Sequence, residues 1–353
     1  MMYVVLAIFI LGLLGGGVYF KDTQAEKGSV VLIAFIIVVS LAVMAGIRSP
    51  DIAPDYQNYI GWLEGVRNNN SFFDEIKDPL FVGLFLAVKE LGFSDVLFFC
   101  LIAFLSLIFK YVFSRNIFDG KYCLGILFLI LSRFYIPHDF IQIRVGLAIG
   151  LSSVGLVFFY KARRALGSAL YLAGIGMHMS VIIFSPIYIM LFFNIRHLSR
   201  KALTCILLAS VALSLLFPSS IEYLSNIGRL APYLNGDYAT TAIPLFSFYF
   251  MSRCIIVLLL LIFLFDHLQE IEKFVLFMSL LGVSVQLMLS WNDALSLRFA
   301  EVFGFFDMAM LFIMFRFLDS ESKIIYGCGL LLMSAIYYCS SLKLVQDYAV
   351  SVS

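Results

Sequence analysis

The chain has 353 residues, of which 62% are hydrophobic and only 13% are charged. Soluble domains are about half apolar and about a quarter charged, so a soluble core could not hide this much apolar surface. The formal net charge of +1 excludes the strongly basic character of a nucleic-acid-binding protein. We therefore predict an integral membrane protein with no nucleic-acid partner.

Apolar runs that approach the roughly 20 residues of a spanning helix recur along the whole chain. We expect helices at about residues 3–20, 29–46, 96–114, 121–136, 140–160, 202–218, 245–265, 274–291, 296–318 and 324–341. Two further stretches do not fit this count, because 80–92 is short and contains Lys89 and Glu90, while 166–193 is long and interrupted; each is either a single span or a broken or re-entrant element. The sequence thus predicts an all-α polytopic membrane protein with about 10–12 transmembrane helices, in one domain covering residues 1–353.

The basic residues predict the orientation of the chain, because Lys and Arg in short loops mark the cytoplasmic side. Two clusters flank the interrupted stretch: Lys161, Arg163 and Arg164 before it, and Arg196, Arg200 and Lys201 after it. If both clusters are cytoplasmic, residues 166–193 enter the membrane and return on the same side. The outward segments are then the two long polar loops, at about 47–79 and 219–244, together with 136–140, the turn near His178 and 291–296.

The first outer loop combines acidic and aromatic side chains. Tyr56, Tyr59 and Leu63 have helical spacing, which predicts an amphipathic helix on the membrane surface, with its aromatic residues in the interfacial belt. The loop has two interpretations. It is either a solvated acidic loop, or Asp51 or Asp55 is a catalytic or substrate-orienting carboxylate.

The densest polar feature places Arg133, His138, Asp139, Gln142 and Arg144 within twelve residues. Pro137 is expected to break the helix here, so that a second helix starts with Asp139 near its N-terminus. Arg144 then lies about one turn inside that helix, where a charge is costly unless it faces the bundle or a water-filled cavity. Arg144 is interpreted either as a phosphate ligand or as the partner of a carboxylate such as Asp139 or Asp55.

Other ionisable groups stand in apolar surroundings. His178 is either a packing residue or, if its stretch is re-entrant, a general base on the outer face. Arg253 and Asp307 lie within apolar helices, and Arg298 and Glu301 are three positions apart, where mutual pairing is the simplest interpretation.

The known motifs of ATP hydrolysis, zinc catalysis and Ser-triad hydrolysis are missing from the sequence. The six cysteines have no CxxC spacing, so neither a zinc site nor a disulfide framework is indicated. We expect no metal and no cofactor.

Three segments carry a resemblance to a known family: PDYQNYIGWLEGV in the first outer loop, FIQIRVGLAIGLSSVGLVFFYKARR, and GIGMHMSVIIFSPIYI. Their order resembles that of the EpsG family, the Wzy-like polymerases of bacterial surface polysaccharides, with an acidic-Tyr loop, an Arg-x-x-x-Ala helix and a His-x-Ser segment. The resemblance covers roughly the first 200 residues. The family often has Arg-Gln where Arg144 is followed here by Val145, with Gln142 two positions earlier.

The resemblance implies a membrane glycosyltransferase of the bacterial inner membrane, with a GT-C-like arrangement among the possible folds. It would transfer a glycan from undecaprenyl pyrophosphate to a lipid-linked repeat unit at the periplasmic face. Its partners would be the undecaprenyl-pyrophosphate-linked oligosaccharide, membrane lipid and a chain-length regulator. The roles that follow are pyrophosphate binding by Arg144, Arg253 and Arg298, base catalysis by His178, acceptor orientation or base catalysis by Asp55, and substrate binding by Arg133, His138, Asp139, Gln142 and Glu301.

Two other functions fit the same residues. A lipid-linked oligosaccharide flippase could guide a pyrophosphate across the membrane with the same arginines, although the internal repeats of many transporters are not visible in this sequence. An O-antigen ligase would use the same polyprenyl carrier.

Overall fold

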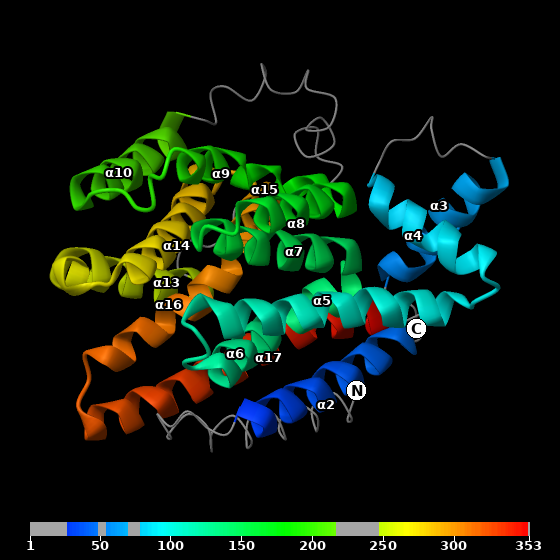
Figure 1. The fold of residues 1–353 in the computed structure, drawn as a ribbon, viewed down its shortest axis with the longest axis horizontal. Helices are drawn as coiled ribbons and strands as arrows, with labels where there is room; N and C mark the ends of the chain where they lie inside the picture. Colours follow the sequence, from blue (N-terminus) through cyan, green and yellow to red (C-terminus); the bar gives the residue numbers. More distant parts are fainter. Residues whose placement is uncertain (1–26, 49–53, 70–77, 217–246, 352–353) are drawn as a thin grey trace. The chain divides into compact units, whose positions relative to one another are not determined.

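The structure is a computed structural model, which describes residues 27–48, 54–69, 78–216 and 247–351 (Figure 1). Within these ranges the chain is helical and has no strand. Among the described residues, six helices are long and apolar enough to cross a membrane: 95–117, 123–141, 143–160, 248–267, 270–288 and 320–345. Two shorter apolar helices are found there at 31–46 and 179–192. The prediction of an all-α polytopic membrane protein is confirmed.

The described residues form two compact units. Unit 1 takes the chain up to Tyr188 and from Phe317 onward, and unit 2 takes Ile189–Arg316. Unit 1 contains α2 (Lys27–Gly46), α3 (Pro54–Asn69), α4 (Pro79–Glu90), α5 (Asp95–Ile117), α6 (Cys123–Phe134), η2 (Tyr135–Ile141), α7 (Ile143–Tyr160), α8 (Arg164–Met177), η3 (Met179–Phe184), the first half of α9 (Ser185–Phe192) and α17 (Ser320–Ser351). Unit 2 contains α10 (Arg200–Leu216), α13 (Phe248–Leu259), η5 (Leu260–Leu264), η6 (Phe265–His267), α14 (Glu270–Met288), α15 (Asp293–Val302), α16 (Gly304–Ile313) and η7 (Met314–Arg316).

Most expected helices are present, with some changes of length. The expected helix at 3–20 and the outer loop at 219–244 lie outside the described residues. The expected helix at 296–318 is instead α15, α16 and η7, with a break at Phe303. Helix α4 has 12 residues, so at 1.5 Å per residue it is about 18 Å long and too short to span the hydrocarbon. The stretch 80–92 is therefore a partial element, which was one of the two alternatives for it.

Glycines bring α7 and α8 into close antiparallel contact. A Cβ on Gly155 would lie 2.8 Å from the carbonyl oxygen of Gly167, and a Cβ on Gly174 would lie 2.1 Å from Oγ of Ser152. Backbones approach this closely only where small residues face each other, as is common between membrane helices. The start of α7 and the end of α8 therefore lie at the same end of unit 1.

Beyond α8 the chain turns back on itself. Tyr171 of α8 hydrogen-bonds Ser185 of α9 at 2.5 Å, and its ring stacks on that of Tyr188 at 4.1 Å between centroids. The Tyr188 hydroxyl also donates to the carbonyl of Gly167 near the start of α8. The two helices are thus antiparallel, with a turn between His178 and Phe184. This geometry confirms that the stretch 166–193 is broken and returns.

The corner expected at Pro137 lies elsewhere. Residues Tyr135–Ile141 continue α6 as a fully buried π-helix, and the chain breaks at Gln142, whose N–H donates to the carbonyl of Pro137 at 2.8 Å. The wider π turn accommodates a proline that would clash with the preceding turn of an α-helix. The prediction that Pro137 ends the helix and that Asp139 starts the next one is wrong, because α7 begins at Ile143.

Candidate functional site

Helix α3 builds one wall of the candidate site. It begins with Pro54 and carries Asp55 in its first turn, where a fixed φ and a negative charge both suit a helix N-terminus. Tyr59 is 5% exposed and packs on Phe81 of α4, while Trp62 lies parallel to the same ring at 6.3 Å. The predicted helix is present, and its aromatic side chains pack on α4 and α5 within the protein.

Arg144 reaches this aromatic wall from the first turn of α7. Its Cζ atom lies 5.2 Å from the ring centroids of both Tyr59 and Trp62, and its Nη1 forms an ion pair with Asp78. The Asp78 side chain is 4% exposed, whereas that of Arg144 keeps 18% of its surface exposed. An ion pair with a carboxylate was one of the two interpretations of Arg144, and it is present. The partner is Asp78, so the prediction of Asp139 or Asp55 as the partner is wrong.

Tyr59 connects several charged groups of the site. It hydrogen-bonds Arg144, and burial raises the pKa of its hydroxyl to about 12. The phenol is therefore protonated at neutral pH and retains a proton for hydrogen bonding. Asp55, which is half-buried one turn earlier on α3, acts on Tyr59 through its charge. The predicted carboxylate Asp55 thus lies within electrostatic range of the Arg144 cluster.

His178 lies at the same end of unit 1 as Arg144. Gly176, two residues before it, packs on Leu80, two residues after Asp78; a Cβ on this glycine would lie 2.7 Å from Cγ of Leu80. The Nδ1 atom of His178 accepts the backbone N–H of Ser180 at 3.2 Å and contacts the hydroxyl of the same serine at 2.9 Å. Because a ring nitrogen that accepts an amide N–H has no proton, the neutral ring carries its proton on Nε2. His-x-Ser therefore fixes the tautomer.

The basic residues of the loops lie at the opposite end of α7 and α8. Lys161, at the C-terminal end of α7, forms an ion pair with Asp119 and donates to the carbonyl of Asn116. Arg163 and Arg164 follow at the start of α8. The acidic, aromatic end of unit 1 and its basic end are therefore separated by the length of these helices.

Asp139 and His138 are buried in the π-helix. Both side chains are fully buried, and Oδ1 of Asp139 receives hydrogen bonds from Ser106 at 2.6 Å and from Lys110, which is also an ion-pair partner. His138 stacks on Phe134 at 5.1 Å. These contacts favour a structural role for Asp139 over its predicted role in substrate binding. Arg133 and Gln142 flank the π-helix and are half-buried.

Unit 2 contains the other predicted arginines. Arg253 is 2% exposed, and its Nε lies 3.0 Å from Oδ2 of Asp307 while its Nη1 donates to Gln286 at 2.8 Å. Tyr249 donates to the same carboxylate and lies under the guanidinium. This network joins α13, α14 and α16, so we interpret Arg253 as structural. Arg298 is exposed and Glu301 half-buried on α15, and their substrate contacts stay predictions.

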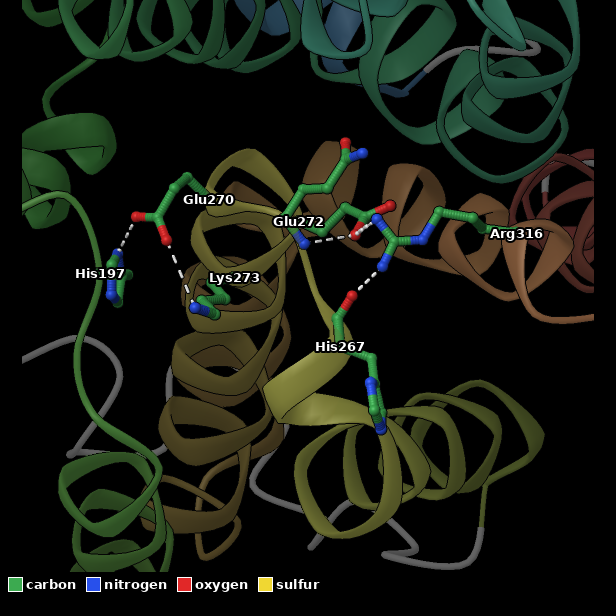
Figure 2. Close-up of polar contacts among 7 residues, drawn as sticks. His197, His267, Glu270, Glu272, Lys273 and Arg316 are labelled. Carbon is green, nitrogen blue, oxygen red and sulfur yellow. Dashed lines mark hydrogen bonds and ion pairs between the residues drawn. The ribbon is translucent and has the colours of Figure 1, made fainter.

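A second polar cluster in unit 2 surrounds the start of α14 (Figure 2). Glu270 lies between His197 at 2.7 Å and Lys273 at 3.3 Å. Glu272 forms a capping box with Gln269 and an ion pair with Arg316 at 2.7 Å, while Arg316 also donates to the carbonyl of His267. These pairs satisfy a helix N-terminus and the charges beside it, so we interpret the cluster as structural.

Two buried basic residues were not predicted as functional from the sequence. Lys110 lies in the middle of α5 and is fully buried, and Arg48 follows α2 and is 6% exposed. An ionisable residue inside a long apolar run is expensive in lipid and could have marked Lys110. Arg48 gave a weaker signal, because it stands at the edge of such a run. No group of three or more potential metal ligands occurs among the described residues.

Comparison with known proteins gives one family. No curated protein and no solved structure matches the chain. The model of the EpsG family matches residues 31–351, which extends the resemblance from roughly the first 200 residues to nearly the whole chain. The chain therefore belongs to the EpsG family of Wzy-like polysaccharide polymerases and is a multi-pass membrane protein of polysaccharide biosynthesis.

Proposed function

We propose that this polymerase transfers a growing glycan from undecaprenyl pyrophosphate onto a lipid-linked repeat unit, at the periplasmic face of the bacterial inner membrane. The observation that supports the proposal most is the cluster around Arg144. A guanidinium that keeps part of its surface exposed lies beside Tyr59 and Trp62 and is oriented by Asp78. Arginine matches phosphate geometry with two parallel donors, and aromatic rings suit the apolar faces of sugars.

The reaction replaces one bond to the anomeric carbon by another. The acceptor hydroxyl of the repeat unit attacks the anomeric carbon of the donor glycan while the bond from that carbon to the pyrophosphate oxygen breaks. The bonding electron pair stays on the departing pyrophosphate, and the acceptor proton passes to a carboxylate base. Arg144 stabilises the negative charge that develops on the leaving group, which is the contribution that preorganised cationic donors make best.

We assign the base to Asp55 and not to His178. The Nδ1 atom of His178 is occupied by the amide of Ser180, and Nε2 carries the proton of the neutral ring, so this ring is suited to donate a hydrogen bond. Asp55 is a half-buried carboxylate that acts on Tyr59 beside Arg144. His178 then donates from Nε2 to an oxygen of the carrier phosphate or the sugar.

The basic end of α7 and α8 supports the proposed sidedness. Lys161, Arg163 and Arg164 lie at the end opposite to Arg144 and His178. If the positive-inside rule assigns these loops to the cytoplasm, the Arg144 end faces the periplasm. Lipid-linked repeat units that have already been flipped would meet the site there.

The surface glycan of a deletion strain tests the proposal. Loss of the polymerase should leave a surface with a single repeat unit, and Arg144→Ala should fail to restore the ladder of longer chains. Arg67→Ala is the matched control, because Arg67 is a half-exposed arginine near the C-terminus of α3 and should restore the ladder. A surface without any glycan would indicate a flippase instead, and polymer retained on its lipid carrier would indicate a ligase. Full ladders with Arg144→Ala would reject its role.

A further inference from the structure

Arg48 contacts the same group of aromatic rings as Arg144, but through different members of it. Its Cζ atom is 4.7 Å from the ring centroid of Phe99 and 5.4 Å from that of Tyr56. Phe99 also packs on Tyr59, the ring that Arg144 covers. The two guanidinium groups therefore flank one group of aromatic rings, and the charge of each acts on Tyr59.

The guanidinium of Arg48 is buried with most of its donors unused. Nη1 donates to the carbonyl of Ala45, but Nε and Nη2 have no hydrogen-bond partner among the described residues. Close packing of Gly46 against Cys100 fixes the end of α2 beside α5, since a Cβ on Gly46 would lie 2.0 Å from Sγ. A buried cation of this kind is costly unless a counter-charge arrives.

Capping of α2 accounts for only part of this arrangement. The contact with Ala45 satisfies one of the last carbonyls of the helix, and a cation suits a helix C-terminus. That contact uses Nη1 alone and leaves Nε and Nη2 without a hydrogen-bond partner among the described residues. Burial lowers the pKa of Arg48 to about 10, so the side chain is still protonated at neutral pH.

The charge balance of the Arg144 cluster indicates why a second cation would be needed to bind pyrophosphate. Arg144, Asp78 and Asp55 together carry a net charge of −1, and Arg48, on which the charge of Asp55 also acts, brings the cluster to neutrality, whereas a pyrophosphate leaving group carries at least two negative charges. We propose that Arg48 is a second phosphate-binding residue, which pairs with the carrier pyrophosphate together with Arg144. This inference rests on the proposed function, because it uses the same leaving group.

Titration of the purified full-length protein in detergent with inorganic pyrophosphate tests the inference by calorimetry. Arg48→Met, which keeps the packing on the rings, should weaken binding at least tenfold, and Arg48→Lys should weaken it several-fold. Arg67→Met, at a half-exposed arginine paired with Glu64, should change binding less than twofold. Orthophosphate and phosphatidylglycerol in mixed micelles should each bind the wild type at least tenfold more weakly than pyrophosphate.

Thermal unfolding without ligand separates binding from a structural role. Removing a buried charge that uses only one of its hydrogen-bond donors should leave the midpoint of Arg48→Met unchanged or raise it, while the stabilisation by pyrophosphate is lost. A lower midpoint with unchanged pyrophosphate affinity would assign Arg48 to helix capping and overturn the inference. Unchanged affinity in Arg48→Met with loss in Arg144→Met would overturn it while sparing the proposed function. A wild type that binds no pyrophosphate would overturn both, and equal binding of phosphatidylglycerol would make a lipid headgroup the ligand.

Discussion

Asp78 and Arg144 form an ion pair between residues that are 66 positions apart in the chain. Asp78 adopts a left-handed backbone conformation with φ 55° directly before the proline that starts α4, and Arg144 lies in the first turn of α7. The pair therefore joins the start of α4 to the start of α7, and it holds the guanidinium against Tyr59 and Trp62.

Asp78→Asn should lower both stability and polymer formation. Breaking a buried pair costs about 3–5 kcal/mol, and the partial exposure of Arg144 lowers the expected cost for this pair to about 2–3 kcal/mol. Thermal unfolding in detergent measures the loss. Glu64→Gln is the matched control, because Glu64 pairs with Lys89 and Arg67 at a more exposed position and should cost less than about 1 kcal/mol. Equal stability of the two variants would show that the Asp78 pair contributes little.

The pair of Lys110 and Asp139 gives the second prediction. Lys110→Met leaves a buried carboxylate without its cation and should destabilise the protein by about 3–5 kcal/mol. The double variant Lys110→Met with Asp139→Asn should recover most of this loss, because the amide oxygen still accepts from Ser106. If the pair is structural, the recovered protein makes glycan of normal length. A stable double variant without polymer would instead support the predicted substrate role of Asp139.

Gly146 should tolerate no side chain. A Cβ at this position would lie 2.6 Å from the carbonyl oxygen of His138, a backbone atom of the π-helix that cannot move away as a side chain would. Gly146→Ala should cost about 1–3 kcal/mol. Gly83→Ala on α4 is the control, since a Cβ there meets nothing within 4 Å and should stabilise the helix by about 0.4–1 kcal/mol. If the unfolding midpoints of the two variants shift in the same direction, the prediction is contradicted.

The helices and the broken elements could be predicted from the sequence, because both depend on local composition. Glycines and the short apolar run of α4 were visible without a structure, and so was the cost of burying Arg144. The partner of that arginine was not visible. Asp78 is one of several acidic residues in a long polar loop, and only the packing of α3, α4 and α7 selects it.

Local rules failed where a neighbouring helix decided the outcome. Pro137 predicts a break in isolation, but α6 continues through a π turn whose backbone is packed against Gly146. Hydropathy alone did not reveal Lys110, because a single charge hardly changes the mean hydropathy of a 23-residue helix, although its charge in an apolar run was visible. Its pairing with Asp139 depends on a contact 29 positions away in the chain.

The fixed tautomer of His178 gives the last prediction. With Nδ1 held by the amide of Ser180, the proton of the neutral ring is on Nε2, the atom that we propose donates to the substrate. Gln can present an amide N–H near the position of Nε2, whereas the shorter Asn reaches only the position of Nδ1. His178→Gln should therefore retain measurable polymer formation. His178→Asn and His178→Ala should each form at least tenfold less polymer than His178→Gln. Glycan ladders from complemented deletion cells, at matched protein levels, make the comparison. If Gln is as inactive as Ala while the folded protein level is normal, the ring acts by accepting a proton, and the base role returns from Asp55 to His178.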